Sequence, residues 1–363
     1  MTFDPEHLHV IRCYGRLPPL PGGMEQHIAA LTAEQRKLGV QVTELYNAGA
    51  PSGESVQILP RWRLDRLHPY LLRESLFYGA AASKRLSFSD KRYRVVHVHG
   101  DWPSFLFGSM FARLLGADAV AATIHEWARG SPRFYALALR NCDAVFATGR
   151  QEAQLLQHLT GKTVTHLPSA PADLFFSPPK RNAKASDVIV AGSLIARKNL
   201  DLVLGVAERR PGLSIAVYGG GPELPRLESL LAKKRLNNVH LHGPVDQETL
   251  HSAMYEGKLF LNTALAEGSP TAALEAMACG LPVVLTRSND FSDLIDEGVN
   301  GRVVDKWDAD TIAAAMDEFL IDPQRLSRAR KAARRTAGQH RWVKKAQTVT
   351  QIMIASAAKG HRR

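Results

Sequence analysis

The feature that most constrains the fold is a regular alternation, along nearly the whole chain, of short apolar runs with longer amphipathic stretches. Short apolar runs between turn residues are typical of buried strands in a parallel sheet, and the amphipathic stretches have the spacing of helices. We expect strands at 40–45, 95–98, 119–124, 144–147, 188–191, 213–218, 239–241, 259–262 and 282–286. This alternation predicts an α/β protein in which helices cover parallel sheets.

The chain is long enough for two such domains, because 363 residues would fill two domains of roughly 150 residues each. The segment 175–186 is rich in proline and in basic or small residues, which is typical of a linker, and the alternation starts again after it. We therefore expect one domain over 1–175 and another over 176–340, with a cleft between them. Ligands of open α/β sheets bind beyond the carboxyl ends of the strands, so the loops that follow strands are the informative ones.

The charge of the chain calls for an acidic partner. Its formal net charge is +11 at pH 7 and its isoelectric point is about 9.7. A nucleic acid, an anionic lipid surface and a phosphorylated substrate would all qualify. No helix-turn-helix, zinc finger or aromatic-basic strand motif of a nucleic-acid-binding protein is recognisable, so we expect no nucleic-acid partner.

The spacing of the cysteines and the distribution of apolar residues bear on the cellular compartment in which the protein is expected. Cys13, Cys142 and Cys279 are widely spaced and form no CxxC pair, which argues against a disulfide framework and for a reducing environment. Residues 1–10 are polar and do not resemble a signal peptide, and no stretch reaches the ~18 uninterrupted apolar residues of a membrane span. We expect a cytoplasmic protein.

The most specific segment is Glu267–Glu275, with the sequence EGSPTAALE. Ser269 is a good N-cap and Pro270 a good first helical residue, so a helix should begin here and run to about Cys279. A strand, a loop and a helix in this order aim backbone N–H groups and the positive end of the helix dipole at the ligand. Such a helix start is a phosphate site that needs no metal.

This segment resembles the E-x7-E signature of glycosyltransferase family four, a large group of retaining enzymes. The resemblance implies that Glu275, about two turns into the helix, holds the donor ribose, and that Glu267 contacts the hydroxyls of the donor sugar. The other donor-binding residues of the segment would be Gly268, Ser269, Pro270 and Thr271. The alternative is that both glutamates are solvated carboxylates at the edge of a helix.

The same resemblance implies the GT-B fold, in which two Rossmann-like domains face a central cleft. The N-terminal domain, 1–175, would then bind the acceptor, and the C-terminal domain, 176–340, would bind the nucleotide-sugar. The last segment, 341–363, resembles the closing helix of the family, which crosses back to the N-terminal domain.

A second element lies at the start of the C-terminal domain. The run from Gly192 to Lys198 resembles the family's strand-loop element G-R-L-x-x-x-K, in which a basic pair neutralises the donor diphosphate. Lys198 falls on the lysine position, and Gly192 would bind the donor. Ser193 replaces the usual arginine, and the neighbouring Arg197 could supply that charge. Alternatively, Arg197 and Lys198 are a surface pair of cations.

Two loops of the first domain carry further candidates. Gly22 and Gly23 precede a helix predicted over 24–38, where a loop can approach a ligand closely, and the family has a similar glycine loop near the donor. His125 follows the strand expected at 119–124 and matches the family's T-x-H-D/E element, where the histidine approaches the donor sugar. A structural histidine is the alternative.

Two other motifs have simpler explanations. His97 and His99 could bind a metal, but no third ligand has a sensible spacing, so packing at a strand end is the commoner interpretation. The turn 218–222 resembles the family's G-x-G-P turn and should shape the donor pocket through Gly220. It is not a G-x-G-x-x-G fingerprint, so nothing indicates a nicotinamide cofactor. Residues 166–173 lack the Asn-Gly that relatives have there, and no role is assigned to them.

The segment 59–86 mixes cations with leucine and aromatic residues, which suits a helix lying on an anionic membrane surface. The alternative is an ordinary amphipathic helix packed on the first sheet. Because relatives often act on lipid-linked acceptors, the resemblance favours peripheral attachment to the inner face of the cell membrane.

Together these motifs predict a retaining, metal-independent glycosyltransferase that takes a sugar from a nucleotide diphosphate donor and passes it to a glycan or a lipid-linked acceptor in cell-envelope biosynthesis. No Asp-x-Asp motif stands where a metal would bind the diphosphate, so we expect neither metal nor cofactor. One alternative is an epimerase or hydrolase of sugar nucleotides on the same architecture. Another is a catalytically degenerate partner protein that binds nucleotide or lipid. The base, the sugar, the acceptor and the linkage remain open.

Overall fold

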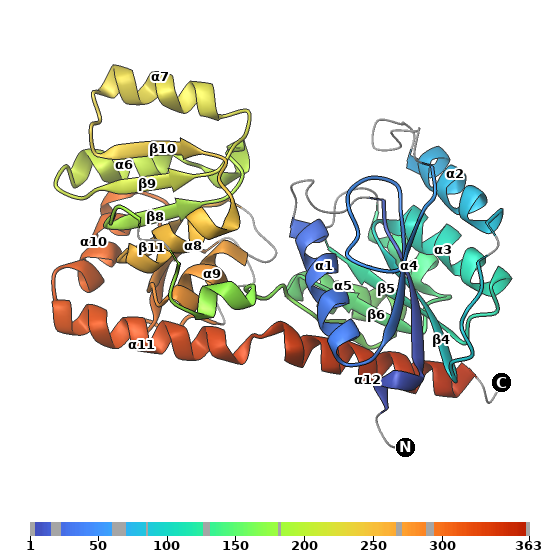
Figure 1. The fold of residues 1–363 in the computed structure, drawn as a ribbon. Coiled ribbons are helices and arrows are strands. Elements are labelled where there is room, and N and C mark those ends of the chain that lie inside the picture. The colour runs from blue at the N-terminus through green and yellow to red at the C-terminus, as the bar shows by residue number, and fades with distance from the viewer. Residues whose placement is uncertain are drawn as a thin grey trace. The chain divides into compact units, whose positions relative to one another are not determined.

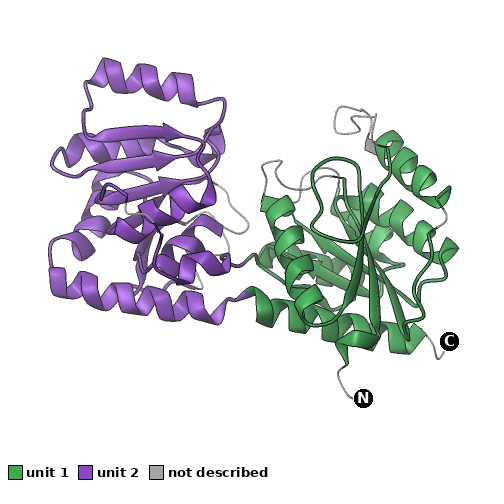
Figure 2. Cartoon of the chain, in the orientation of Figure 1, with its two compact units in different colours: residues 1–169, 342–363 green, residues 170–341 purple. Residues whose placement is uncertain are grey.

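The computed structural model describes residues 4–15, 23–59, 70–84, 86–125, 131–180, 183–265, 271–287 and 294–360. The chain divides into two compact units (Figure 2), unit 1 with residues 1–169 and 342–363 and unit 2 with residues 170–341. The division falls at residue 170, a few residues before the expected boundary at 175/176. The reason is that Phe175, expected at the start of a linker, is buried in the core of unit 2.

Unit 1 is built on a parallel sheet (Figure 1). Within the described residues this sheet has seven strands in the order β3-β2-β1-β4-β5-β6-β7. The strands are β1 (Leu8–Cys13), β2 (Gln41–Tyr46), β3 (Ser55–Gln57), β4 (Tyr93–His99), β5 (Ala119–Ile124), β6 (Ala144–Ala147) and β7 (Val164–His166). All neighbouring pairs are parallel. Strands β1, β5 and β6 are buried along their whole length, as expected for a sheet covered on both faces.

Two groups of helices cover this sheet. Their bounds are α1 (Gly23–Lys37), α2 (Tyr70–Ala82), α3 (Trp102–Leu114), α4 (Pro132–Leu139), α5 (Arg150–Thr160) and α12 (Trp342–Gly360), with a short 3-10 helix, η1 (Pro5–His7). Helices α2, α3, α4 and α5 contact one another in series and share a core with the sheet. Helix α12, from the end of the chain, packs against α1, β4 and β5, and Gln35 Nε2 donates a hydrogen bond to Thr350 Oγ1 (2.9 Å). The end of the chain is therefore part of unit 1.

Unit 2 repeats the same plan. Within the described residues its parallel sheet has six strands in the order β10-β9-β8-β11-β12-β13. They are β8 (Val188–Ala191), β9 (Ile215–Tyr218), β10 (Val239–Gly243), β11 (Leu259–Asn262), β12 (Val283–Thr286) and β13 (Gly301–Val304). The helices are α6 (Asp201–Arg209), α7 (Leu224–Lys234), α8 (Gln247–Glu256), α9 (Thr271–Cys279), α10 (Ala309–Leu320) and α11 (Pro323–Gln339), with the 3-10 helices η3 (Asp173–Phe176) and η4 (Ala196–Lys198).

The ends of several helices follow from local chemistry. The side chain of Asp246 accepts a hydrogen bond from the Thr249 amide at the start of α8, and Asp308 does the same for Thr311 at the start of α10. Gly161 ends α5 with a φ of 66°, a left-handed conformation that favours glycine.

In both sheets the strand order reverses beside the first strand of the unit, between β1 and β4 in unit 1 and between β8 and β11 in unit 2. The crevice at such a switch point, beyond the carboxyl ends of the strands, is where open α/β sheets bind ligands. The prediction of an α/β protein with two Rossmann-like domains is confirmed, and the two switch points show where to look for a site.

The segment 59–86 is described only in part, because 60–69 and 85 lie outside the described residues. In α2, Phe77 and Tyr78 are buried in the core of unit 1, while Leu71 and Leu72 are exposed (44% and 46%). Helix α2 is therefore an amphipathic helix packed against α3, with an apolar pair left at the surface near its start. Among the helices described here, none combines the length and the apolar character needed to cross a bilayer.

Candidate functional site

A pocket lies in unit 2 at the switch point between β8 and β11. Its polar edge is formed by the loops that follow these two strands, and β8 and β11 themselves contribute apolar side chains. Outside β8, the residues that line it include Gly192, Ser193, Leu194, Lys198 and Thr263, together with Asn262, the last residue of β11. Gly192 and Lys198, both predicted from the sequence, are thus brought together in one pocket.

The loop at Gly192 lines this site, and a second glycine-containing loop, 219–221, packs against it. Gly192 and Gly219 have φ values of +144° and +141°, which side-chain-bearing residues rarely adopt. A Cβ on Gly219 would overlap the carbonyl oxygen of Gly192. Backbone hydrogen bonds join the two loops, with the Gly192 amide donating to Tyr218 O (3.0 Å) and the Leu194 amide to Gly220 O (2.9 Å). The predicted residue Gly220 therefore supports the loop that carries Gly192.

Lys198 is held in this pocket by its backbone. Thr263 Oγ1 donates a hydrogen bond to the carbonyl of Lys198 (2.9 Å), and the Leu265 amide donates to the carbonyl of Arg197 (2.8 Å), so η4 is fixed to the loop after β11. A Cβ on Gly192 would lie 3.5 Å from Lys198 Nζ, which places the ammonium group directly against this glycine. The side chain of Arg197 is exposed and is not part of the pocket lining. A cation beside a glycine backbone suits an anion such as a phosphate.

Glu275 is the second notable group of unit 2. It lies in α9, one turn after Thr271, the half-buried first residue of this helix, and its side chain is buried. Burial raises the pKa of the Glu275 carboxyl to about 7. Among the described residues, none forms a hydrogen bond or an ion pair with this carboxylate. A buried carboxylate without a protein donor is suited to accept hydrogen bonds from a ligand hydroxyl pair.

The remaining predicted residues of these segments are placed only in part. Gly22, Glu267, Gly268, Ser269 and Pro270 lie outside the described residues. Gly23 is the first residue of α1; it is exposed, and a Cβ placed on it would meet open space.

In unit 1, histidines gather at the carboxyl ends of β4 and β5. His125 directly follows β5, and its Nε2 lies 2.9 Å from Nδ1 of His99, the last residue of β4; the planes of the two rings differ by 26°. His97, two residues earlier in β4, is fully buried and its Nε2 is hydrogen-bonded to Thr123 Oγ1 (2.8 Å). Among the described residues, no group of three or more His, Cys, Asp or Glu is arranged to hold a metal ion.

A third histidine, from α1, covers this pair. The ring of His27 meets that of His125 edge to face at 4.8 Å between centroids, and its Nδ1 is 3.0 Å from Ser169 Oγ. Trp342, at the start of α12, packs on the other side of His27. Burial lowers the pKa of His125 to about 3 and the pKa values of His27 and His99 well below the ordinary range. These rings are therefore neutral at physiological pH.

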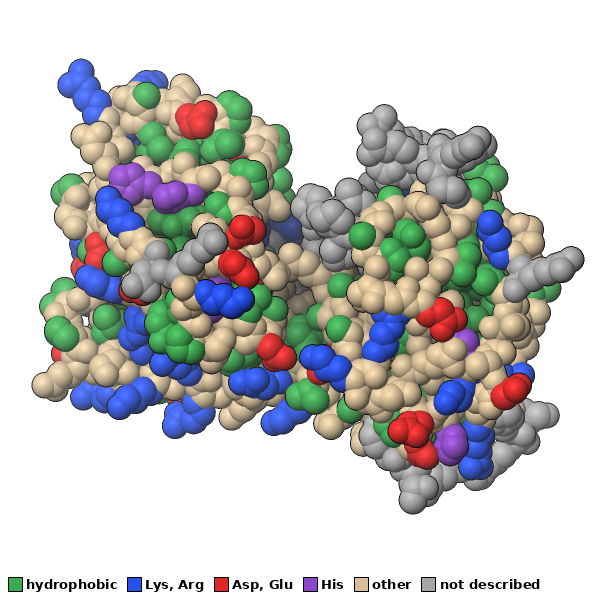
Figure 3. All heavy atoms as spheres, in the orientation of Figure 1, with side chains coloured by type: hydrophobic (Ala, Val, Ile, Leu, Met, Phe, Trp, Pro, Cys, Tyr) green, Lys and Arg blue, Asp and Glu red, His purple; other side chains and the backbone are tan. Residues whose placement is uncertain are grey.

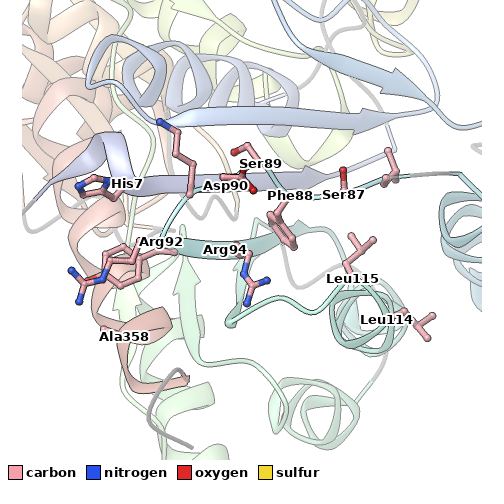
Figure 4. Close-up of a pocket in the computed structure, with 13 residues that line it drawn as sticks. His7, Ser87, Phe88, Ser89, Asp90, Arg92, Arg94, Leu114, Leu115 and Ala358 are labelled. Carbon is pink, nitrogen blue, oxygen red and sulfur yellow. The ribbon is translucent and has the colours of Figure 1, made fainter.

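A wider surface depression of about 1070 Å³ occurs elsewhere in unit 1 (Figure 4). Its lining includes Phe88 and Arg92 from the segment that leads into β4 and Arg94 from β4 itself, together with Leu115 and Ala358. It lies beside the amino end of β4, at the opposite edge of the sheet from His125. Because open α/β sheets bind ligands at the carboxyl edge, we do not assign the function to this depression.

Sequence reasoning missed several residues of both sites. Asn262 and Thr263 line the pocket of unit 2, and the signal that could have found them is their position at the end of an apolar strand next to the switch point. For His99 the sequence favours packing, and for His27 it gives no signal. Only the tertiary structure places these two rings against His125.

Comparison with known proteins gives the same assignment for both halves of the chain. Residues 21–171 match the model of "Glycosyltransferase Family 4", and residues 173–336 match that of "Glycosyl transferases group 1". The chain is 26% identical over 305 residues to a human phosphatidylinositol N-acetylglucosaminyltransferase subunit, covering 77% of this chain and 62% of that protein. It is 27% identical over 296 residues to a GDP-mannose-dependent alpha-(1-6)-phosphatidylinositol monomannoside mannosyltransferase of Mycolicibacterium smegmatis, covering 74% and 71%. The chain thus spans less than two thirds of the human relative.

Solved structures agree on the fold. Anabaena Alr3699/HepE in complex with UDP and glucose superposes with a TM-score of 0.75 at 15% identity, covering 96% of this chain and all of that one. WaaG, a glycosyltransferase involved in lipopolysaccharide biosynthesis, superposes with a TM-score of 0.68 at 15% identity, covering 95% and 99%. The chain therefore belongs to glycosyltransferase family 4 (glycosyl transferases group 1), a family of retaining glycosyltransferases with the GT-B fold.

Proposed function

We propose that the chain transfers a sugar, with retention of configuration, from a nucleotide diphosphate-sugar to an acceptor, without a metal or a cofactor. The observation that carries this proposal is the buried carboxylate of Glu275 in unit 2, which burial holds at a raised pKa and for which the described residues provide no donor. Two vicinal ribose hydroxyls would supply the missing hydrogen bonds and favour the ionised form.

The pocket between β8 and β11 supplies the other half of the donor site. Lys198 lies against the backbone of Gly192, so a diphosphate resting on this glycine would meet a cation. The start of α9 at Thr271, with the preceding Gly268 and Ser269, would add amide N–H groups and the positive end of a helix dipole. Glu267 would then contact the sugar. Arg197 is a secondary candidate, since its side chain is exposed.

The reaction that these residues support is a displacement at the anomeric carbon. The bond from this carbon to the diphosphate oxygen breaks, and a bond to the acceptor oxygen forms on the same face of the sugar. The leaving phosphate oxygen takes the acceptor proton, so no side chain is needed as a nucleophile. Lys198 and the dipole of α9 stabilise the charge that develops on the leaving group. From unit 1, His125 and the loop at Gly22 and Gly23 would contact the transferred sugar.

For the acceptor we propose a lipid-linked molecule at an anionic membrane surface. Three observations support this proposal. Relatives from human and Mycolicibacterium smegmatis are named for transfer to phosphatidylinositol-based lipids. In unit 1, Leu71 and Leu72 leave an apolar pair at the surface of α2. In unit 2, taken by itself, lysine and arginine side chains gather along α11 (Figure 3), where Arg328, Lys331 and Arg335 are exposed. The protein would then act at the inner face of the cell membrane.

The test is release of the nucleotide from UDP-, GDP- and ADP-sugars, with and without vesicles that contain phosphatidylinositol lipids. We expect turnover with one donor, strong stimulation by the acceptor, and loss of turnover in Glu267→Ala and Lys198→Ala. Lys233→Ala, which removes an exposed lysine of the same unit, is the matched control and should behave as the wild type.

The two alternative functions give other results in the same assay. Donor turnover that is independent of any acceptor would favour a hydrolase or an epimerase. Nucleotide binding without turnover of any donor would favour a degenerate partner protein. Full activity of Glu267→Ala would overturn the assignment of that residue.

A further inference from the structure

The histidine pair at the carboxyl ends of β4 and β5 has a geometry that goes beyond packing. His125 Nε2 and His99 Nδ1 are 2.9 Å apart, a hydrogen-bonding distance, in residues separated by 26 positions. Thr148 holds the backbone of His125, since Thr148 Oγ1 donates to the His125 carbonyl (2.8 Å) and the Thr148 amide donates to the Ile124 carbonyl (3.0 Å). The backbone is thus fixed by Thr148, and the orientation of the ring depends on its neighbours.

The protonation states of the two rings limit the kinds of hydrogen bond that they can form with each other. Burial and the neighbouring histidines lower the pKa of His99, and burial lowers that of His125, so both rings are neutral. Two neutral imidazoles at this distance share one proton, which one ring donates and the other accepts. The nitrogen that His125 uses toward His99 is Nε2, and its proton state decides the state of Nδ1. Among the described residues, none is hydrogen-bonded to Nδ1 of His125.

His99 itself has no other polar partner among the described residues. Its Nε2 is buried and forms no hydrogen bond, so Nδ1, toward His125, carries the one hydrogen bond of this ring. A buried polar nitrogen without a partner is costly, and an apolar side chain of similar shape would avoid that cost. The ring is therefore badly suited to a role in packing alone.

We propose that His99 is a positioning residue, which holds the His125 ring in one orientation and one tautomer so that Nδ1 of His125 meets the transferred sugar. The inference rests on the proposed function, in which His125 contacts that sugar. His27 supports the same arrangement, because its ring packs edge to face against His125 and is itself held by Ser169. A fixed tautomer gives a sugar hydroxyl a partner of defined polarity before substrate binds.

Two substitutions of His99 separate positioning from packing. In His99→Asn, the amide group stands close to the place of Nδ1 and keeps a polar partner for His125, although the ring is lost. In His99→Phe, the ring volume is kept and the nitrogen is lost. If His99 only fills space, Phe should be tolerated better than Asn, whereas a positioning role predicts the reverse order.

The first readout is the tautomer of His125, which the ¹⁵N chemical shifts of its ring nitrogens report without any need for activity. The signals are assigned by their loss in His125→Asn. We expect one tautomer in the wild type and in His99→Asn, and a mixture in His99→Phe. The matched control is His9→Asn, which changes a buried histidine of the neighbouring strand β1 that bonds to Thr43 (2.9 Å) instead; it should leave the His125 tautomer unchanged.

The second readout is kinetic. We expect kcat of His99→Phe to fall about tenfold or more, with a smaller change for His99→Asn and with unchanged affinity for the free nucleotide, which unit 2 binds. A single, unchanged tautomer of His125 in His99→Phe would overturn the inference, as would a mixture of tautomers in the wild type. If the wild type turns over no donor, the proposed function fails, and the tautomer experiment still decides whether His99 orients His125.

Discussion

Removing the charge of Glu275 should make the protein more stable at alkaline pH while it weakens donor binding. The carboxylate is buried, and the described residues offer it no hydrogen-bond donor, so its ionisation in the free protein opposes folding. In Glu275→Gln the side chain keeps its size and stays neutral at every pH. The variant therefore isolates the free-energy cost of ionising one group.

The size of this effect follows from the pKa. A carboxyl whose pKa moves from 4.5 in the unfolded chain to about 7 in the folded protein costs up to about 3 kcal/mol of stability when it is ionised. Between these pKa values the folded state binds more protons than the unfolded state, so the contribution of this group to stability falls as the pH rises. From about pH 5 to about pH 8, the free energy of unfolding of the wild type should fall by roughly 2 to 3 kcal/mol, a loss that Glu275→Gln does not share.

The measurement is urea unfolding of both proteins across this pH range, without nucleotide. The relevant quantity is how the difference between their free energies of unfolding changes with pH. Any cost of burying the glutamine amide does not depend on pH and therefore cancels. Glu228→Gln, which removes a carboxylate from the surface of the same unit, is the matched control and should track the wild type. If the free energies of unfolding of Glu275→Gln and the wild type change in parallel with pH, the claim that ionisation of Glu275 destabilises the folded protein is refuted.

Three further predictions concern the donor site. The affinity for a nucleoside diphosphate should weaken as the pH falls below about 7, because the carboxylate of Glu275 must be ionised to accept hydrogen bonds from hydroxyl groups. Calorimetric titration should show this pH dependence of the affinity in the wild type and not in Glu275→Gln. Lys198→Ala should lower kcat by about a hundredfold or more, because a cation facing the leaving group is lost, whereas Lys233→Ala should not; equal rates in the two variants would remove Lys198 from the site. Gly219→Ala should destabilise unit 2 by about 2 kcal/mol or more, because the new methyl group overlaps the facing loop and the positive φ is strained. Gly212→Ala, where the methyl group meets open space, is the control, and thermal unfolding should show that it keeps the stability of the wild type.

Much of the fold could be predicted because buried parallel strands appear in the sequence as uninterrupted apolar runs. Strands β5, β6, β8 and β11 have the same bounds as the runs at 119–124, 144–147, 188–191 and 259–262. Strand β1 was not expected, although it is an interior strand of its sheet and lies beside the switch point, because His9 and Arg12 interrupt its apolar character.

Arg12 shows why such a strand is hard to recognise. Its guanidinium group is fully buried and is hydrogen-bonded to Thr32 and Gln35 of α1, and burial lowers its pKa to about 10. These partners lie in the next helix, well outside the strand, so no local pattern in β1 reveals them. A buried charge with tertiary partners looks like a surface charge in the sequence.

The residues of the candidate site also fall into those that the sequence could predict and those that it could not. Lys198 and Glu275 could be predicted because a short motif carries each of them. The junction of the loops at Gly192 and Gly219, and the hydrogen bond between His99 and His125, could not, because each joins segments from different strands. Local motifs predict the groups that we propose to meet a ligand, whereas only the fold shows the groups that hold them in place.

The most direct test of the central claim is a thermodynamic cycle between the ribose hydroxyls and Glu275. Calorimetry would compare the binding of a nucleoside diphosphate and of its 2′,3′-dideoxy analogue to the wild type and to Glu275→Gln at about pH 8, where the carboxylate is ionised. We predict that loss of the hydroxyls weakens binding to the wild type by about tenfold to a hundredfold and has little further effect in the variant. Equal losses in both proteins would show that Glu275 does not hold the ribose and would contradict the account.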